Sequence, residues 1–134
     1  MPNPTNLVML HGTLSSDPRA RTLPSGDELI AYEVTTDIGD ERLSVPVVWF
    51  SPRRTPALAA GDDVVALGAV RRRFYRAGGA SASRTEVVAE VVARSGTRSA
   101  DRAVDAVRSV LASSTEIAAG RAGAEGSPQQ RPAR

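Results

Sequence analysis

The chain has 134 residues, with 17 basic and 15 acidic groups, one histidine and no cysteine, so its formal net charge is +2. All the basic groups are arginines, and 41% of the residues are apolar, which is enough for one folded domain with a core. The lack of cysteine excludes disulfides, thiolate metal sites and a cysteine nucleophile.

The first part of the chain is predicted to be all-β. Apolar or alternating runs bounded by turn residues predict strands at 7–14, 19–23, 29–35, 43–50, 64–76 and 84–94. Turns are expected at 24–26 and 37–40, a connector with one helical turn at 51–61, and a flexible loop at 77–83. Pro46 indicates an edge strand or a bulge. Five or six strands with such short turns favour a closed or nearly closed antiparallel barrel.

The hydrophobic period changes after residue 96. Apolar residues recur at helical spacing over 99–119, which predicts an amphipathic helix with Ser99 as its N-cap. We expect its apolar stripe to pack on the barrel or on a neighbouring subunit, and a DNA-facing role for Arg98, Arg102 and Arg108 is the less favoured interpretation. Residues 120–134 are rich in Gly, Pro, Gln and Arg and are predicted to be a disordered tail.

The sequence lacks the parts of an enzyme. His11 lies inside a strand with no acidic neighbour in sequence, so a structural or surface role is expected for it. Asp62-Asp63 could suggest a metal pair, but a solvated turn is the commoner explanation, and Gly78-Gly79 has no following helix that would make a phosphate loop. We therefore expect no catalytic residue, no metal and no cofactor.

Charge is distributed unevenly. Residues 1–97 carry 11 arginines and 11 acids, so the net +2 comes from residues 98–134, and the overall charge says little about a nucleic-acid partner. No acid occurs between Asp63 and Glu86, where five arginines lie with two aromatic residues. Side chains alternate along a strand, so Arg71, Arg73 and Tyr75 (hereafter the Arg71 face) share one side.

Two guanidinium groups and a ring on one side of a strand suit single-stranded nucleic acid, because arginines meet phosphates and rings stack on bases. The alternative is that the arginines only solubilise a protruding hairpin. Trp49-Phe50 is a second aromatic site, followed by Arg53 and Arg54. Strand parity places Trp49 in the core and Phe50 outside, unless a bulge at Pro46 reverses them.

Several ordered blocks resemble the bacterial single-stranded DNA-binding protein family. These are NLVMLHGTLSSDP at 6–18 with Arg21 and PSG at 24–26, VVWF at 47–50, AGDDVVALGAVR at 60–71 and RTEVVA at 84–89. The resemblance covers about residues 6–93. It implies a five-stranded oligonucleotide-binding (OB) fold barrel with a long protruding hairpin, and we assign this domain to residues 1–97. It also implies a homo-oligomer, a tetramer or a dimer, that coats single-stranded DNA without sequence preference in replication, recombination or repair.

The resemblance also selects binding residues: Arg21, Phe50, Arg71, Arg73 and Tyr75. Together with the neighbouring arginines, the candidate nucleic-acid-binding set is Arg21, Phe50, Arg53, Arg54, Arg71, Arg73, Tyr75, Arg76 and Arg84. No secretory signal and no apolar stretch near the roughly 18 residues of a membrane span are seen, so we expect a cytoplasmic, nucleoid-associated protein without membrane contact.

The sequence departs from the family in three ways. The 37–42 turn is short, and the tryptophans that the family commonly has before and after this loop are absent, with Asp40 and Ser44 nearby, so binding weaker than in typical members is expected. The chain ends in QQRPAR in place of an acidic tail, so recruitment of repair or replication proteins through such a tail is not expected. The helix at 99–119 is not part of the family pattern. An OB-type interaction or assembly module with weak or vestigial nucleic-acid affinity is therefore the alternative function.

Overall fold

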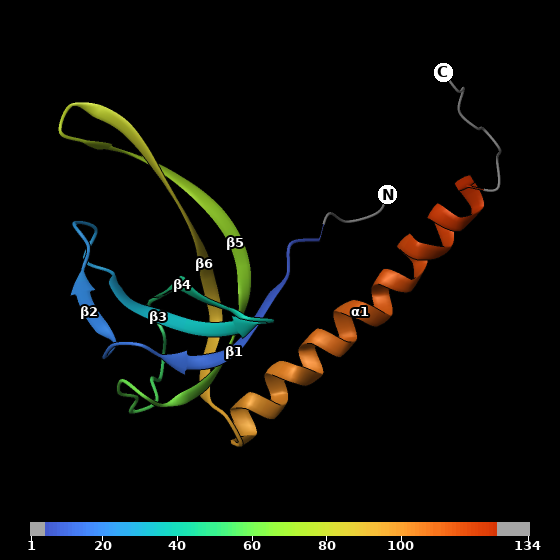
Figure 1. Cartoon of the computed structure of the whole chain (residues 1–134), viewed down its shortest axis with the longest axis horizontal. Helices are drawn as coiled ribbons and strands as arrows, with labels where there is room; N and C mark the ends of the chain where they lie inside the picture. Colours follow the sequence, from blue (N-terminus) through green and yellow to red (C-terminus); the bar gives the residue numbers. More distant parts are fainter. Residues whose placement is uncertain (1–4, 126–134) are drawn as a thin grey trace.

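The structure is a computed structural model that describes residues 5–125 of the chain, with side-chain surroundings up to residue 113 (Figure 1). The described part is mostly β, with six strands followed by one helix. Their bounds are β1 (Val8–Leu14), β2 (Arg19–Thr22), β3 (Glu28–Ile38), β4 (Glu41–Phe50), β5 (Asp63–Ala77), β6 (Ala80–Arg94) and α1 (Arg98–Glu125). The predicted strands are confirmed in number and order, and so is a C-terminal helix.

The strands pair in a ring. β1 pairs with β5, β5 with β6, β6 with β4, and β4 with β3, and β3 returns to β1 through Thr13–Thr35 and Leu14–Val34. β2 lies outside this ring, paired with β3 alone within the described chain. All these pairs are antiparallel except β4–β6, which is parallel and short, at Val47–Val87 and Val48–Val88.

The main hydrophobic core lies inside the ring. Because strand side chains alternate, each ring strand contributes inward apolar residues to it. They include Leu14, Tyr32, Val34, Val47, Val64, Val87 and Val92, with Trp49 packed against them. Burial raises the pKa of the Tyr32 hydroxyl to about 12, because the charged form would be poorly solvated there.

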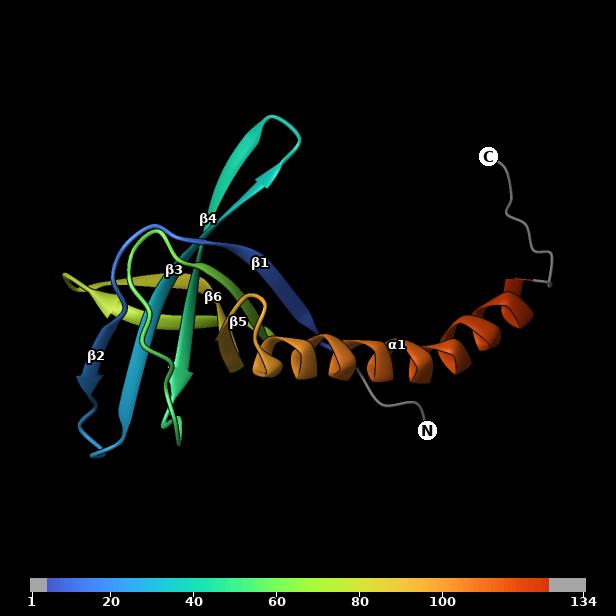
Figure 2. The same ribbon diagram turned by 90° about the horizontal axis from the view of Figure 1, so that it is seen from below.

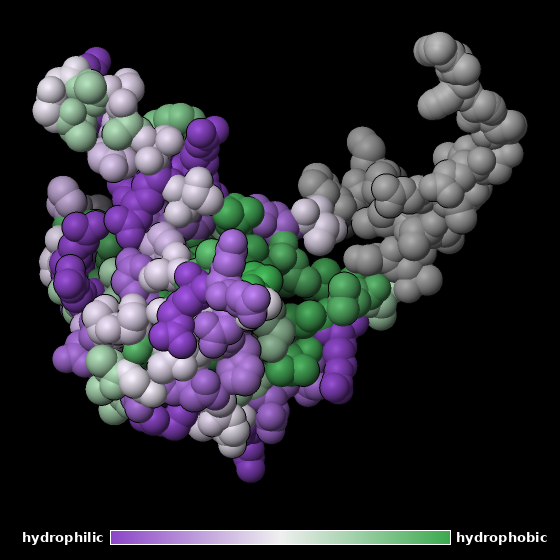
Figure 3. All heavy atoms as spheres, in the orientation of Figure 1, coloured by the Kyte–Doolittle hydropathy of each residue, from purple (hydrophilic) through white to green (hydrophobic). Residues whose placement is uncertain are grey.

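A second, smaller cluster joins the helix to the sheet. Ala100 and Ala103 pack against Val65, Leu67 and Ala93 on the outer side of β5 and β6. The small alanines allow close approach, and Figure 3 shows apolar surface gathered where α1 meets the sheet. Beyond this contact α1 extends away from the strands (Figure 2). The expected packing of the helix on the body is thus confirmed for its first turns. No helix in the described part is apolar enough over sufficient length to cross a membrane.

The prediction of a flexible loop at 77–83 is wrong. β5 and β6 are joined by Gly78 and Gly79 alone, both with positive φ (60° and 83°), and Ala77 pairs directly with Ala80. A two-residue turn with two positive φ angles fits the twist of the strands, and glycine adopts it without a steric penalty. Residues 80–83 therefore belong to a hairpin whose two strands have 15 residues each.

The ends of the helix also differ from the prediction. Thr97, not Ser99, is the N-cap, since its Oγ1 accepts the Ala100 N–H at 3.3 Å. The helix continues past the expected end at residue 119 to Glu125, because a glycine inside a helix costs only about 1 kcal/mol and does not by itself end it. The part of the predicted tail at 126–134 lies outside the described residues.

The connector 51–61 contains no helical turn, contrary to expectation. Side chains hold it instead. Asp62 Oδ2 accepts the Ala59 N–H at 2.8 Å, Asp17 Oδ1 accepts the Ala60 N–H at 2.8 Å, and Arg94 donates to the Ala57 carbonyl at 2.7 Å. These bonds take over the backbone donors and acceptors that a helical turn would have paired.

Pro46 lies in β4 without a bulge. The register with β3 is continuous, with Pro46 opposite Glu33, while β6 joins β4 only from Val47 onward. Proline, which has no N–H to donate, thus sits in the part of the strand whose second edge has no neighbour among the described strands. The edge interpretation is confirmed, and the parity of Trp49 and Phe50 is preserved.

Candidate nucleic-acid interface

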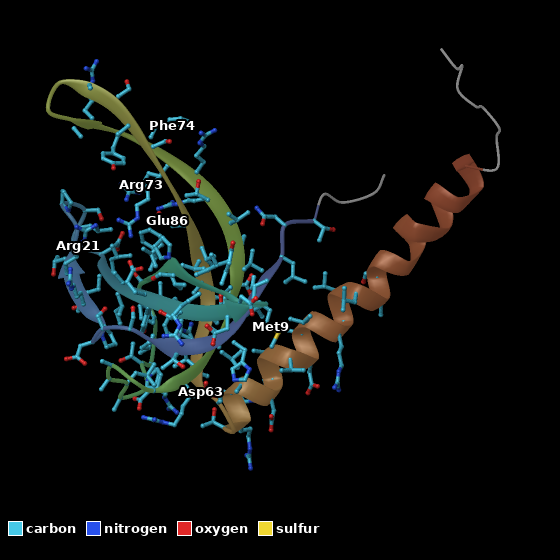
Figure 4. All side chains as sticks on the ribbon, viewed as in Figure 1. Met9, Arg21, Asp63, Arg73, Phe74 and Glu86 are labelled. Atoms are coloured by element: carbon cyan, nitrogen blue, oxygen red, sulfur yellow. The ribbon has the colours of Figure 1, made fainter. Side chains whose placement is uncertain are left out.

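Three arginines of the long hairpin surround one buried carboxylate. Arg71 donates to Glu86 Oε2 through Nε (3.0 Å) and Nη2 (2.9 Å), and Arg73 Nε donates to the same oxygen at 3.3 Å. Arg84 Nε lies 3.8 Å from Oε1. The Glu86 side chain is 1% exposed, whereas the three arginines are 38–47% exposed. Figure 4 shows Arg73 and Glu86 next to each other inside the curve of the hairpin.

This cluster follows from the hairpin register. Arg71 lies opposite Glu86 and Arg73 opposite Arg84, so all four side chains share one face of the two strands. Arg84 also reaches Glu33 on β3 at 3.4 Å. Three guanidinium groups thus share two carboxylates, and much of the positive charge predicted for the Arg71 face is neutralised within the protein.

A cavity of about 320 Å³ opens between this cluster and β2. Arg73 and Arg84 line it from the hairpin, and Arg19 and Arg21 line it from β2. Arg19 and Arg21 are exposed and have no carboxylate partner among residues 5–113, whose side-chain surroundings the structure describes. In Figure 4 Arg21 stands across the opening from Arg73. Arginines from two sides therefore face a space that is open to solvent.

Aromatic rings accompany the arginines. The Arg71 guanidinium carbon lies 5.1 Å from the centre of the Phe50 ring, and that of Arg73 lies 5.2 Å from the centre of the Tyr75 ring. Both distances are typical of cation–π contact. Tyr75 is 41% exposed, and Phe50 is partly exposed at the end of β4. Phe74, 71% exposed, pairs with Arg72 on the opposite side of β5, as strand parity requires.

The structure brings together six of the nine predicted site residues and leaves three elsewhere. The grouped residues are Arg21, Phe50, Arg71, Arg73, Tyr75 and Arg84. Arg76 lies near the hairpin tip, where it donates to the Gly79 carbonyl at 3.1 Å. Arg53 and Arg54 line a different groove beside Trp49.

Sequence reasoning missed Arg19, Glu33 and Glu86. The signal for Glu86 was present, because a turn centred on Gly78-Gly79 places it opposite Arg71 by simple counting. Arg19 shares a face of β2 with Arg21, two residues away, so strand parity could have found it. Nothing local marks Glu33, whose position depends on how β3 approaches the hairpin.

Two other charged groups lie away from this interface. His11 Nε2 and Asp63 Oδ2 are 2.8 Å apart, so the histidine has an acidic neighbour in space, contrary to its lack of one in sequence. Both side chains are more than half exposed, and the hydrogen bond from His11 lowers the pKa of Asp63. The Ala59 N–H, and then Arg94, lower the pKa of Asp62. Within residues 5–125 no three His, Asp or Glu side chains are grouped as metal ligands.

The arrangement is suited to binding an anionic chain. Exposed guanidinium groups line a cavity that is open to solvent, and the partly exposed Phe50 and Tyr75 rings lie beside Arg71 and Arg73. The Glu86 carboxylate between these arginines is 1% exposed and accepts its hydrogen bonds from Arg71 and Arg73. No protein-family model and no curated protein matches the chain.

Proposed function

We propose that the protein binds single-stranded nucleic acid, DNA in the first instance, without sequence preference and without catalysis. The observation that carries the proposal is the cavity where Arg19 and Arg21 of β2 face Arg73 and Arg84 of the hairpin. Phosphates would contact the guanidinium groups, and bases would stack on Phe50 and Tyr75. Each stacked base contributes roughly 1–3 kcal/mol and tolerates any sequence, because every base has a π face.

We also propose that the ring of strands is an OB-fold barrel. The pairing order β1–β3–β4–β6–β5–β1, with β2 as an added edge, supports this, since an OB-fold is a five-stranded, partly open barrel. In that fold the ligand crosses the face of the second and third barrel strands, which are β3 and β4 here, and the loops beside it. The cavity is lined by Ala31 and Glu33 of β3, Val48 of β4 and the hairpin, which supports this location.

Assembly and cellular role belong to the same proposal. A homo-oligomer, either a tetramer or a dimer, would present several such binding faces to one DNA strand. The protein would act in the cytoplasm, on the nucleoid. Replication, recombination and repair are the processes that generate single-stranded DNA for it to cover.

The second candidate is an OB-type interaction or assembly module with vestigial nucleic-acid affinity. One observation favours it: Glu86 and Glu33 neutralise part of the arginine charge that would meet phosphates. Two features oppose it: Arg19 and Arg21 have no carboxylate partner among the described side chains, and the Tyr75 ring is 41% exposed.

Oligothymidylate binding, followed by fluorescence anisotropy at two salt concentrations, tests the proposal. The logarithm of the affinity should fall with the logarithm of salt by about 0.7 per phosphate contacted. Arg73→Ala and Tyr75→Ala should each weaken binding about tenfold, whereas Arg42→Ala, an exposed arginine in the β3–β4 hairpin, should leave it unchanged. Absence of salt-sensitive binding at micromolar protein, or unchanged binding in both variants, would refute nucleic-acid coating and leave the interaction module.

A further inference from the structure

A large groove lies between the connector after β4 and the start of α1. Its volume is about 940 Å³. Trp49 lines its wall together with Arg53 and Arg54 of the connector, Arg94 at the end of β6 and Arg102 in the first turns of the helix. The walls come from β4, the connector, β6 and α1, so the groove exists only in the folded chain.

The charge in this groove, hereafter the Trp49 groove, is mostly unpaired. Arg53, Arg54 and Arg102 are exposed and form no ion pair within the described residues. Arg94 pairs with Asp62 at 3.1 Å, and Glu90 is the one carboxylate on the lining. At the Arg71 face, by contrast, the guanidinium groups of Arg71 and Arg73 form ion pairs with Glu86. The Trp49 groove therefore offers more uncompensated positive charge than that face.

The two sites are neighbours along β4. Trp49 and Phe50 are adjacent, so their rings point to opposite sides of the strand. Trp49 faces the groove, and Phe50 lies beside Arg71. Ser51, the residue after Phe50, turns the chain from β4 into the connector. Its φ is 46°, and its N–H donates to the Glu28 carbonyl at 2.8 Å. Arg54 is four positions after Phe50, a span of at most about 14 Å.

We propose that the Trp49 groove is a second binding site for the phosphate backbone of single-stranded nucleic acid. A strand held at the Arg71 face continues around the corner at Ser51 and enters this groove, where Arg53, Arg54 and Arg102 contact its phosphates. The inference rests on the proposed function and extends it. It also assigns a role to the start of α1, which positions Arg102 against the connector. An acidic protein segment is the other anionic chain that such a groove could take, and the test separates the two.

The test uses the full chain and two labelled oligothymidylates. One has about 4 nucleotides and covers the Arg71 face alone, and the other has about 16 and reaches both sites. The variant Arg54→Gln/Arg102→Gln removes two groove charges. The control Arg42→Gln/Arg108→Gln removes two exposed arginines that lie outside both sites. In the wild type Arg42 pairs with Asp37 and Arg108 with Asp105. Thermal melting followed by circular dichroism checks that both variants fold.

The groove variant should bind the long oligomer about tenfold more weakly than the wild type. Its salt slope should be smaller by about 1.4, because two phosphate contacts are lost. Its affinity for the short oligomer should not change, and the control should match the wild type with both. Trp49, the single tryptophan, provides a second readout: the long oligomer should change its emission in the wild type, and the short one should not.

Each other outcome overturns the inference in a recognisable way. If the short oligomer binds and the groove variant binds the long one like the wild type, the second site is absent but the proposed function stands. An equal loss with both oligomers would show a general charge effect. If neither oligomer binds the wild type, the proposed function fails and the inference fails with it. A labelled decaglutamate peptide that binds the wild type but not the groove variant, without an effect on oligomers, would identify the groove as a protein site.

Discussion

Replacing Glu86 by glutamine removes the negative charge around which Arg71, Arg73 and Arg84 are arranged, while keeping nearly the same shape. In the present structure its two carboxylate oxygens lie 2.9–3.8 Å from the three guanidinium groups, and the side chain is 1% exposed. The amide can still accept a hydrogen bond but carries no charge. The substitution therefore changes the electrostatics of the face without emptying it.

The change has opposite effects on folding and on binding. Loss of charge-assisted hydrogen bonds at a buried group should lower the free energy of unfolding by about 1–3 kcal/mol, and the partial exposure of the arginines keeps the loss below that of a fully buried pair. A phosphate about 8 Å from the removed charge, at an effective dielectric constant of about 40, gains about 1 kcal/mol. Glu86→Gln should thus bind oligothymidylate about fivefold more tightly at low salt.

Anisotropy titrations over a range of salt concentrations measure the binding, and urea unfolding measures the stability. The salt slope should become steeper by about 1.4, since about two arginines are released for phosphate contact. Glu41→Gln, an exposed glutamate at the start of β4, is the control for a general change in net charge. If Glu86→Gln binds no more tightly than Glu41→Gln and its slope is unchanged, the buried carboxylate does not limit the available charge, and the reasoning is wrong.

Three further predictions concern stability. The pKa of Asp62 is lowered in the folded state, so its contribution is present above the usual value of 3.8 and is lost as the pH falls below it. Asp62→Asn should flatten the fall in Tm between pH 5 and 2, and a fall parallel to that of the wild type would contradict this. The pKa of Tyr32 is raised to about 12, so its contribution is present below pH 10 and is lost as the pH rises toward 12. In Tyr32→Phe, Tm should depend less on pH over that range, and a curve parallel to the wild type would contradict this. In Gly68→Ala the new Cβ would collide with the Val88 carbonyl oxygen, so urea unfolding should show a loss of about 2–3 kcal/mol or more. An unchanged midpoint would mean that the strands can separate locally at little cost.

The strands were predictable because their hydrophobic pattern is strong. Val64 to Leu67 is an apolar run between Asp63 and Gly68, and 87–92 is apolar except for Glu90; their buried residues form parts of the two hydrophobic clusters. The common face of Arg71, Arg73 and Tyr75 was also predictable, because every second side chain of a strand points to the same side. Boundaries were less accurate, because the alternating alanines and serines at 80–83 resemble a loop until the two-residue turn fixes their partners on β5.

The candidate site was predictable only in part. Sequence parity finds residues on one strand but not the groups that approach from another, so the neutralising Glu33 and the facing Arg19 were missed. Arg53 and Arg54 were singled out from the sequence beside Trp49-Phe50, whereas Arg102, 48 positions after Arg54, lines the same groove only because the first turns of α1 pack on β5 and β6. Contacts of that range depend on the tertiary fold, which local patterns do not specify.

Pro46 has a consequence for self-association of the protein through its sheet edge. The outer half of β4, from Glu41 to Val45, has β3 on one side and no strand on the other among the described residues, which leaves backbone donors and acceptors available to another chain. Edges of this kind are the starting points of open-ended strand addition and aggregation. A proline at the inner end of that stretch removes a donor, and Glu41 and Arg42 add charges at its outer end. The hairpin can therefore project into solvent, as in Figure 2, without acting as a template for fibres.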